Sequence, residues 1–275
     1  MKAVRLKTEY LTNPVGIDSK SPRLYWNCEG GIKQTAYQII AKVNGKTVWN
    51  SGKVESSAMT HIPYGGPELH SRQRVYWSVK LWDEKGEGGE ISHSFFEMGL
   101  LNTSDWKAKW ITGNYKVRKS ERYPVDCFRK PISVTKVVSS ARLYITACGL
   151  YEAKMDGRRI GDFVLAPGHT DYRKRVQYQT IDVTELVKEG ENVLALHFGG
   201  GWYTHRCRVF GLPKAIYCIS AETSDGVKNF CSDTHCRIGK SFVEDYDFTE
   251  FETHNYTDFS SCFDTEFDDS GWEYA

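Results

Sequence analysis

The sequence predicts an all-β protein made of two successive β-sandwich domains. Short runs of alternating apolar and polar residues recur along the 275-residue chain, and no stretch shows the longer apolar period of a helix. Turn signals built on Gly, Pro, Asn and Asp separate these runs at the spacing typical of sandwiches. A short break at residues 99–104 divides a smaller domain, residues 1–100, from a larger one, residues 105–275.

The first domain is predicted to be an immunoglobulin-like or fibronectin type III-like sandwich. The run RVYWSVKLWD alternates strictly and places Val75, Trp77, Val79 and Leu81 on one face. An Asn-Gly pair marks a tight hairpin turn between the first two of the longer strands. The expected longer strands, all of this alternating kind, are residues 36–43, 46–54, 74–83 and 91–98.

The second domain is predicted to be a jelly roll, although the pattern does not give its strand order. Its clearest signal is Asp156-Gly157, which separates two alternating runs and predicts a hairpin closed by a type I′ turn. Pro167-Gly168 then breaks the chain before another alternating run begins. The other expected strands, all short and rich in apolar residues, are 137–147, 176–183, 192–198 and 214–221.

Composition favours a globular protein without a membrane span. Hydrophobic residues make up 40% of the chain and aromatic residues 13%, enough to fill two cores. No apolar run approaches the roughly 18 residues that a transmembrane helix needs. The N-terminal segment MKAVRLKTEYLTNP carries charges throughout and has no signal-peptide pattern. We therefore expect a cytoplasmic protein with no membrane partner, and secretion only with a leader that this sequence lacks.

Charge is unevenly distributed along the chain. The net charge is +1, yet residues 242–275 hold eleven acidic residues and no Lys or Arg, which leaves 36 basic and 24 acidic groups elsewhere. A basic surface can bind nucleic acid or an acidic sugar. No nucleic-acid-binding motif is present, so we expect no nucleic-acid partner. The favoured interpretation is that the acidic C-terminal segment packs across the basic body.

The eight cysteines are too sparse for a disulfide scaffold, and reduced structural thiols are expected. Cys148 and Cys218 fall within strands and are predicted to be buried thiols. Cys231, His235 and Cys236 have a spacing that zinc sites use, but no second pair of ligands follows. We therefore predict no metal site.

A set of sequence motifs identifies a family resemblance. In the first domain these motifs are LTNPVGID, SPRLYW, AYQI, WNSGKV and YWSVKLWDEKG, and in the second they are DWKAKWI, CFRKPI, ARLYITACGLYEAKMDGRRIGD, LAPGHTDYRKRVQYQTIDVT, GENVLAL and GGGWY. In this order they resemble the N-terminal region of bacterial α-L-rhamnosidases of glycoside hydrolase family 78. The resemblance implies that the second domain is similar to carbohydrate-binding modules.

The resemblance also implies where catalysis takes place. Family members hydrolyse terminal α-L-rhamnose with two carboxyl groups in a downstream (α/α)6 barrel, one acting as acid and the other as base. This strand-rich chain lacks such a barrel, so we expect it to be inactive alone. Asp268 and Asp269 could be imagined as a carboxylate pair, but a solvated acidic run explains them better.

The expected function is therefore that of a non-catalytic accessory portion that recognises substrate. Its partners would be the downstream catalytic domain and an L-rhamnose-containing glycan or plant polysaccharide. Two alternatives stay open: a stand-alone carbohydrate-binding protein, and an interaction scaffold that binds no sugar.

Candidate sugar contacts gather in two segments of the second domain. Trp202 and Tyr203 follow three glycines, which would let a ligand approach the backbone, and Trp202 is the leading stacking platform. Trp202 could equally be a tryptophan that packs in the core at the edge of a sheet. Asp171 could accept hydrogen bonds from two sugar hydroxyls with Tyr172 beside it, or cap its own turn. His205 and Arg206 could line the same opening.

Calcium is the one cofactor that the resemblance raises, because some similar modules bind L-rhamnose with its help. After GGGWY this chain reads THRCRVFGLPKA, which lacks the Asp and Asn oxygens that calcium prefers. No calcium ligands are evident, and no other cofactor is expected.

Overall fold

The computed structural model describes residues 1–275 except 115, 117–122, 206–207, 248–249 and 257–261. It confirms the all-β prediction: among the residues described, the one helix is the short 3-10 helix η1 (Thr103–Asp105). None of the described segments is a helix long and apolar enough to cross a membrane. The chain divides into two compact units, Met1–Trp106 and Lys107–Ala275, each with its own core.

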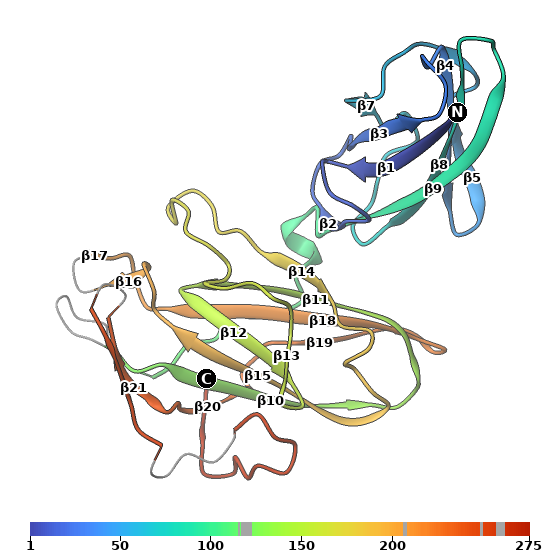
Figure 1. The fold of residues 1–275 in the computed structure, drawn as a ribbon. Coiled ribbons are helices and arrows are strands. Elements are labelled where there is room, and N and C mark those ends of the chain that lie inside the picture. Colours follow the sequence, from blue (N-terminus) through green and yellow to red (C-terminus); the bar gives the residue numbers. More distant parts are fainter. Residues whose placement is uncertain (115, 117–122, 206–207, 248–249, 257–261) are drawn as a thin grey trace. The chain divides into compact units, whose positions relative to one another are not determined.

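The first unit consists of two β-sheets (Figure 1). The smaller sheet has the order β1-β3-β7, and the larger has the order β2-β9-β8-β4-β5, with β6 also paired to β4. The strands are β1 (Lys2–Thr8), β2 (Val15–Ile17), β3 (Arg23–Glu29), β4 (Ala36–Val43), β5 (Lys46–Asn50), β6 (Val54–Glu55), β7 (Ile62–Pro63), β8 (Arg74–Trp82) and β9 (Gly88–Met98).

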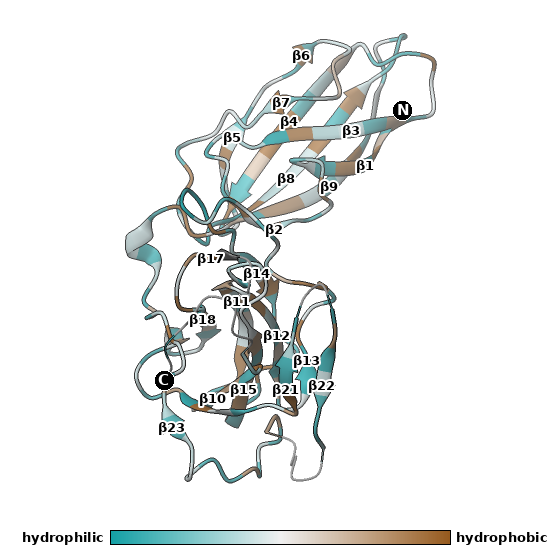
Figure 2. Ribbon diagram, turned by 90° about the vertical axis from the view of Figure 1, so that its left-hand side faces the viewer, coloured by the Kyte–Doolittle hydropathy of each residue, from teal (hydrophilic) through white to brown (hydrophobic). Residues whose placement is uncertain are grey.

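Alternation along β8 determines which face of the larger sheet is buried. Val75, Val79 and Leu81 are fully buried and Trp77 is 1% exposed, while Tyr76, one position along, is 51% exposed. This two-residue period appears in Figure 2 as bands of opposite hydropathy along the strands. The sequence prediction for this face is therefore confirmed.

The second unit is a sandwich of two larger sheets (Figure 1). One has the order β13-β12-β15-β10-β20-β23 and the other β14-β11-β18-β19, while β16-β17 and β21-β22 form separate hairpins. The strands are β10 (Asp126–Val134), β11 (Val138–Cys148), β12 (Leu150–Met155), β13 (Arg158–Arg159), β14 (Gln179–Asp182), β15 (Gly190–Gly199), β16 (Thr204–His205), β17 (Arg208–Val209), β18 (Lys214–Thr223), β19 (Gly226–Cys231), β20 (Arg237–Lys240), β21 (Val243–Tyr246), β22 (Glu252–His254) and β23 (Glu273–Tyr274).

Both large sheets contribute to one core. Phe128 and Leu196 come from the six-stranded sheet, and Leu143 and Tyr217 come from the four-stranded sheet; all four are at most 1% exposed. Burial of aromatic and branched side chains at this density supplies the main stabilising free energy of such a domain.

The predicted hairpin at Asp156-Gly157 connects β12 to β13. Asp156 has φ 47° and Gly157 has φ 76°, as a type I′ turn requires of its two central residues. The Asp156 carboxylate also accepts a hydrogen bond of 2.7 Å from the backbone N–H of Val193 and lies 3.0 Å from the Lys188 ammonium. Asp156 therefore ties the hairpin to β15.

The acidic C-terminal segment covers the outer face of the six-stranded sheet. Cys262 and Phe263 are buried there against Val193 and Ala195 of β15, with Phe267 and Trp272 packed beside them. Arg129 of β10 reaches Asp269 in this segment at 2.8 Å. For these residues, the prediction that the acidic segment packs across the body is confirmed.

The prediction of reduced thiols is wrong at four cysteines. Cys218 forms a disulfide with Cys231, and Cys127 forms one with Cys262. The first pair follows from register, because these residues lie directly opposite each other on β18 and β19. The second depends on the C-terminal segment returning to β10. Cys148 is the buried thiol that was predicted.

Candidate functional site

The predicted contact residues from two segments meet in the second unit. Tyr172 lies with its ring centroid 5.0 Å from that of Tyr203, edge to face, and 5.5 Å from Phe210. His169 bridges this group to Trp202, with centroids 5.3 Å from Tyr172 and 6.4 Å from Trp202. We call these five residues the aromatic cluster.

Trp202 is, with His169, an exposed member of the aromatic cluster. Its side chain is 39% exposed, whereas Tyr172 and Tyr203 are partly buried. It occupies the turn after β15, where the N–H of Tyr203 donates to the carbonyl of Gly200 at 3.0 Å. An exposed indole that is linked through His169 to two phenols is the kind of surface that stacks on the C–H side of a sugar.

Burial affects the chemistry of both tyrosines in the aromatic cluster. Burial raises the pKa of Tyr172, and the neighbouring Cys148 and Tyr203 raise it further. The pKa of Tyr203 is raised by burial and by Cys148. Both phenols therefore stay protonated at neutral pH, so each can donate and accept hydrogen bonds.

The three glycines before Trp202 make room for protein side chains. A Cβ on Gly199 would lie 2.9 Å from the Tyr246 hydroxyl, and one on Gly201 would lie 2.6 Å from Cγ of Leu150. The Tyr246 hydroxyl accepts a hydrogen bond of 2.8 Å from the Gly201 N–H, and burial raises the pKa of Tyr246 to about 12. The space that the glycines leave is therefore filled by Tyr246 and Leu150, which hold the turn that carries Trp202. The sequence prediction was that a ligand would approach the backbone there.

Asp171 organises its own turn. Its carboxylate accepts hydrogen bonds from the N–H of Arg173 at 3.2 Å and from the Arg173 guanidinium at 2.9 and 3.0 Å. Its carbonyl accepts hydrogen bonds from the N–H groups of Lys174 and Arg175. This is the turn-capping alternative of the sequence interpretation, and it holds Tyr172 in the aromatic cluster.

His205 is buried beneath Trp202, with 5.3 Å between the ring centroids. Its Nε2 lies 3.4 Å from a carboxylate oxygen of Asp247, whose side chain is almost fully buried. His205 therefore supports the platform from below. Arg206 lies outside the described residues.

A separate cleft of about 850 Å³ lies over β12 and the end of β15. Lys154 and His197 line it from the sheet, and Phe242 and Tyr246 line it from the hairpin of β21 and β22. Burial, assisted by the charge of Lys154, lowers the pKa of His197 to about 4, so its imidazole is neutral at physiological pH. The cleft is within the size range of small-ligand sites.

Sequence reasoning missed the cleft because its walls come from distant segments. One signal in the sequence could have indicated the cleft. His197 is the single polar residue in the otherwise apolar run VLALHF of β15. A polar residue in such a run marks the solvent-facing or functional position of a strand.

Among the described residues, one group of three metal-ligating side chains converges, and its atoms are not those that calcium prefers. The set of three metal-ligating side chains that converges in the described part of the chain is Cys127, His197 and Cys262, which offers sulfur and nitrogen in place of oxygen. The side chains of Cys231, His235 and Cys236 do not form such a group. Cys231 is in a disulfide, and the side chain of His235 is 80% exposed.

Comparison with known proteins places both units in one family. Residues 3–102 match the model described as the Rha78A-like, N-terminal immunoglobulin domain, and residues 136–275 match the α-L-rhamnosidase N-terminal domain. The chain is 32% identical to an α-L-rhamnosidase of Formosa agariphila over 96% of its own length. It spans about a third of that protein, 32%.

Solved structures agree with this assignment. The α-L-rhamnosidase from Dictyoglumus thermophilum superposes with a TM-score of 0.91 at 33% identity, covering 99% of this chain and 33% of that one. The α-L-rhamnosidase from Aspergillus terreus gives a TM-score of 0.89 at 27% identity, again over 99% and 33% of the two chains. The chain therefore belongs to the α-L-rhamnosidase family, as the N-terminal domain region of these enzymes.

Proposed function

We propose that this chain is a non-catalytic portion of an α-L-rhamnosidase-type hydrolase that recognises a rhamnose-containing glycan. The observation that supports this proposal is the aromatic cluster, in which His169 links the partly exposed Trp202 to the protonated phenols of Tyr172 and Tyr203. Sugar recognition combines such an apolar face with hydroxyl partners. The downstream catalytic domain of the same protein is the second proposed partner, because this chain spans 32% of a relative named as an α-L-rhamnosidase.

The contacts of Asp268 and Asp269 favour a structural role for this acidic pair over a catalytic one. Asp269 is held by Arg129 at 2.8 Å, and Asp268 accepts a hydrogen bond of 2.9 Å from the N–H of Ser270, which lowers its pKa. Two neighbouring carboxylates engaged in such local contacts do not resemble the separated acid and base that face each other across the substrate of an inverting glycosidase.

Binding is expected to be weak. A monosaccharide has about eleven heavy atoms, and roughly 0.3 kcal/mol per atom gives about 3 to 4 kcal/mol. The dissociation constant for L-rhamnose should then be about a millimolar or weaker. Longer glycans that also contact the phenols should bind more tightly.

The test is a titration of the purified chain with L-rhamnose to tens of millimolar, followed by tryptophan fluorescence. The wild type should show a saturable change that Trp202→Ala lacks. Trp110→Ala is the matched control, because Trp110 is similarly exposed, at 42%, in the same unit. A change that survives Trp202→Ala would refute the platform. Hydrolysis of an aryl α-L-rhamnoside by the 275-residue chain would refute the non-catalytic role.

A further inference from the structure

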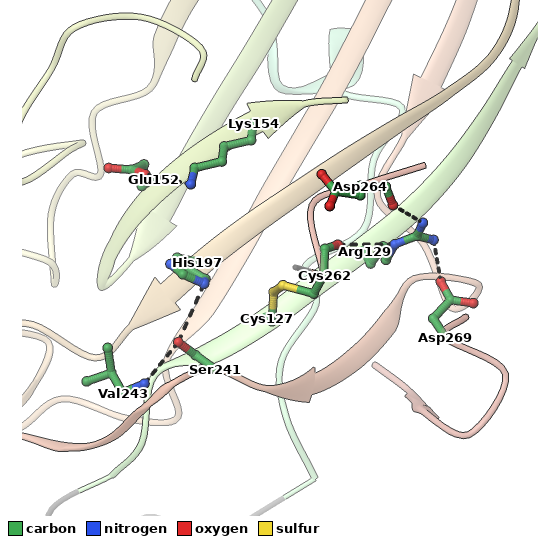
Figure 3. The surroundings of a disulfide bond; sticks show 10 residues. All are labelled: Cys127, Arg129, Glu152, Lys154, His197, Ser241, Val243, Cys262, Asp264 and Asp269. Atoms are coloured by element: carbon green, nitrogen blue, oxygen red, sulfur yellow. Dashed lines mark hydrogen bonds and ion pairs between the residues drawn. A yellow bond between two sulfur atoms is a disulfide. The ribbon is translucent and has the colours of Figure 1, made fainter. Parts of the chain in front are cut away.

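Three side chains that metals favour converge on the outer face of the six-stranded sheet. Cys127 of β10, His197 of β15 and Cys262 of the C-terminal segment each place a ligand atom within 4.8 Å of the other two (Figure 3). In the structure the two cysteines form a disulfide. The aromatic cluster does not include these residues, so this group of side chains is independent of the proposed function.

The protein holds this convergence without relying on the sulfur–sulfur bond. Cys127 and His197 lie directly opposite each other in the pairing of β10 with β15. Arg129 donates hydrogen bonds to the carbonyls of Cys262 at 3.2 Å and Asp264 at 2.7 Å (Figure 3). Phe263 packs on the imidazole of His197, with 4.4 Å between centroids. After reduction the two thiols would therefore remain beside the imidazole.

We propose that Cys127, His197 and Cys262 form a binding site for Zn²⁺ when the two cysteines are reduced. Zinc takes thiolate sulfur at about 2.3 Å and imidazole nitrogen at about 2.0 to 2.1 Å. Two sulfurs on one tetrahedral ion are then about 3.8 Å apart, a spacing that fits within the observed cluster. The Cα atoms of Cys127 and Cys262 are 7.4 Å apart, which leaves room for an ion between the sulfurs.

The surroundings suit a thiolate-bound ion. Cys127 and Cys262 are at most 1% exposed, and two thiolates neutralise the charge of one Zn²⁺. His197 Nε2 is 3.5 Å from the Ser241 hydroxyl, a long contact that costs little to give up. His197 also lines the cleft, so water can occupy the fourth position.

The oxidation state of the two sulfurs decides whether the site can hold zinc. Lys154 extends toward His197 (Figure 3) and has Glu152 as a partner at 3.7 Å. Sulfurs that are bonded to each other are uncharged and cannot act as thiolate ligands, whereas the reduced pair can supply two thiolates. The disulfide and the zinc-bound form are thus mutually exclusive ways of fastening the C-terminal segment to the sheet.

Opening the disulfide requires a two-electron reductant. A phosphine reductant and one water convert the disulfide to two thiols and phosphine oxide. Binding of Zn²⁺ then releases two protons as both thiols become thiolates. Reoxidation needs a disulfide oxidant that takes two electrons, and it expels the ion.

The test uses the full chain with Cys218→Ala/Cys231→Ala, which leaves Cys127–Cys262 as the remaining disulfide among the described cysteines. Phosphine-reduced protein is titrated with Co²⁺, a spectroscopic substitute for zinc. One equivalent should produce sulfur-to-cobalt charge-transfer absorption and the visible bands of tetrahedral cobalt, both abolished by Zn²⁺. Cys127→Ser or Cys262→Ser should eliminate the charge-transfer band, and His197→Gln should weaken binding about tenfold or more. Cys148→Ser, at a buried thiol outside the cluster, should change nothing.

The oxidised and reduced forms of the unsubstituted chain provide a second comparison that does not depend on any variant folding. Reduced chain should bind cobalt and oxidised chain should not, with circular dichroism showing that both are folded. Absence of the charge-transfer band in reduced, folded protein would overturn the proposal. So would equal binding by oxidised protein, or an unchanged band in folded Cys127→Ser.

Discussion

The ring of Tyr172 meets the ring of Tyr203 edge to face, with 5.0 Å between their centroids. This contact joins the loop after Pro167-Gly168 to the turn after β15, two segments that the sequence separates. The platform at Trp202 therefore depends on a packing contact between loops as well as on its own turn.

Replacing Tyr172 by Ala should loosen the aromatic cluster. The substitution removes ring contacts with His169, Tyr203 and Phe210, so we expect the free energy of unfolding of the second unit to fall by about 1 to 3 kcal/mol. Urea denaturation followed by fluorescence measures this. Tyr172→Phe keeps the ring and should lose less than about 0.5 kcal/mol; an equal loss in both variants would contradict a packing role.

Gly201→Ala should disturb the turn that carries Trp202. Gly201 has φ 48°, and a Cβ there would lie 2.6 Å from Cγ of Leu150, so we expect a loss of about 1 to 3 kcal/mol and altered Trp202 fluorescence. Gly168→Ala is the matched control, because Gly168 has φ 97° but nothing lies within 4 Å of the place that its Cβ would take. Both substitutions strain a backbone of positive φ, but only Gly201→Ala also brings a Cβ against Leu150. Identical losses in the two variants would show that the Leu150 contact is unimportant.

Arg129→Met should release the C-terminal segment. Arg129 is 3% exposed, pairs with Asp269 at 2.8 Å and donates to three carbonyls, so removing it leaves buried acceptors without a donor. We expect a destabilisation of about 3 to 5 kcal/mol and faster proteolysis within residues 262–275. Arg129→Lys keeps the charge but cannot reach all partners at once, and should fall between wild type and Arg129→Met. Wild-type protease resistance in Arg129→Met would contradict this role.

The stability of the first unit should fall in acid through Glu9. Its carboxylate accepts hydrogen bonds from the Arg23 guanidinium and from the Arg23 N–H, and these hold the pKa of Glu9 below its usual 4.5. A depressed pKa means that the unfolded chain binds the proton more tightly, so this stabilisation is complete above about pH 5 and is lost as pH falls through the folded-state pKa. Thermal unfolding of wild type and Glu9→Gln across pH 2 to 7 measures it. The two curves should converge in acid, and parallel curves would contradict the assignment.

Much of the strand pattern could be predicted from sequence because it depends on local physics. The burial of Trp77 with Val75 and Val79 follows from the two-residue period of a strand. The turn at Asp156-Gly157 follows from dihedral preferences of the two residues themselves. The grouping of Tyr172 with Trp202 and Tyr203 could be suggested only through resemblance.

The remaining features depend on contacts between distant segments. Strand register decides that Cys218 faces Cys231, and periodicity alone does not give the register of one strand on another. The site of Cys127, His197 and Cys262 requires the C-terminal segment to cross the sheet and be held by Arg129. The sequence by itself determined alternating strands such as β8, their buried faces and tight turns such as Asp156-Gly157, because those depend on neighbouring residues. Only the tertiary structure decided which side chains meet, because the free energy of those contacts depends on the whole packed chain.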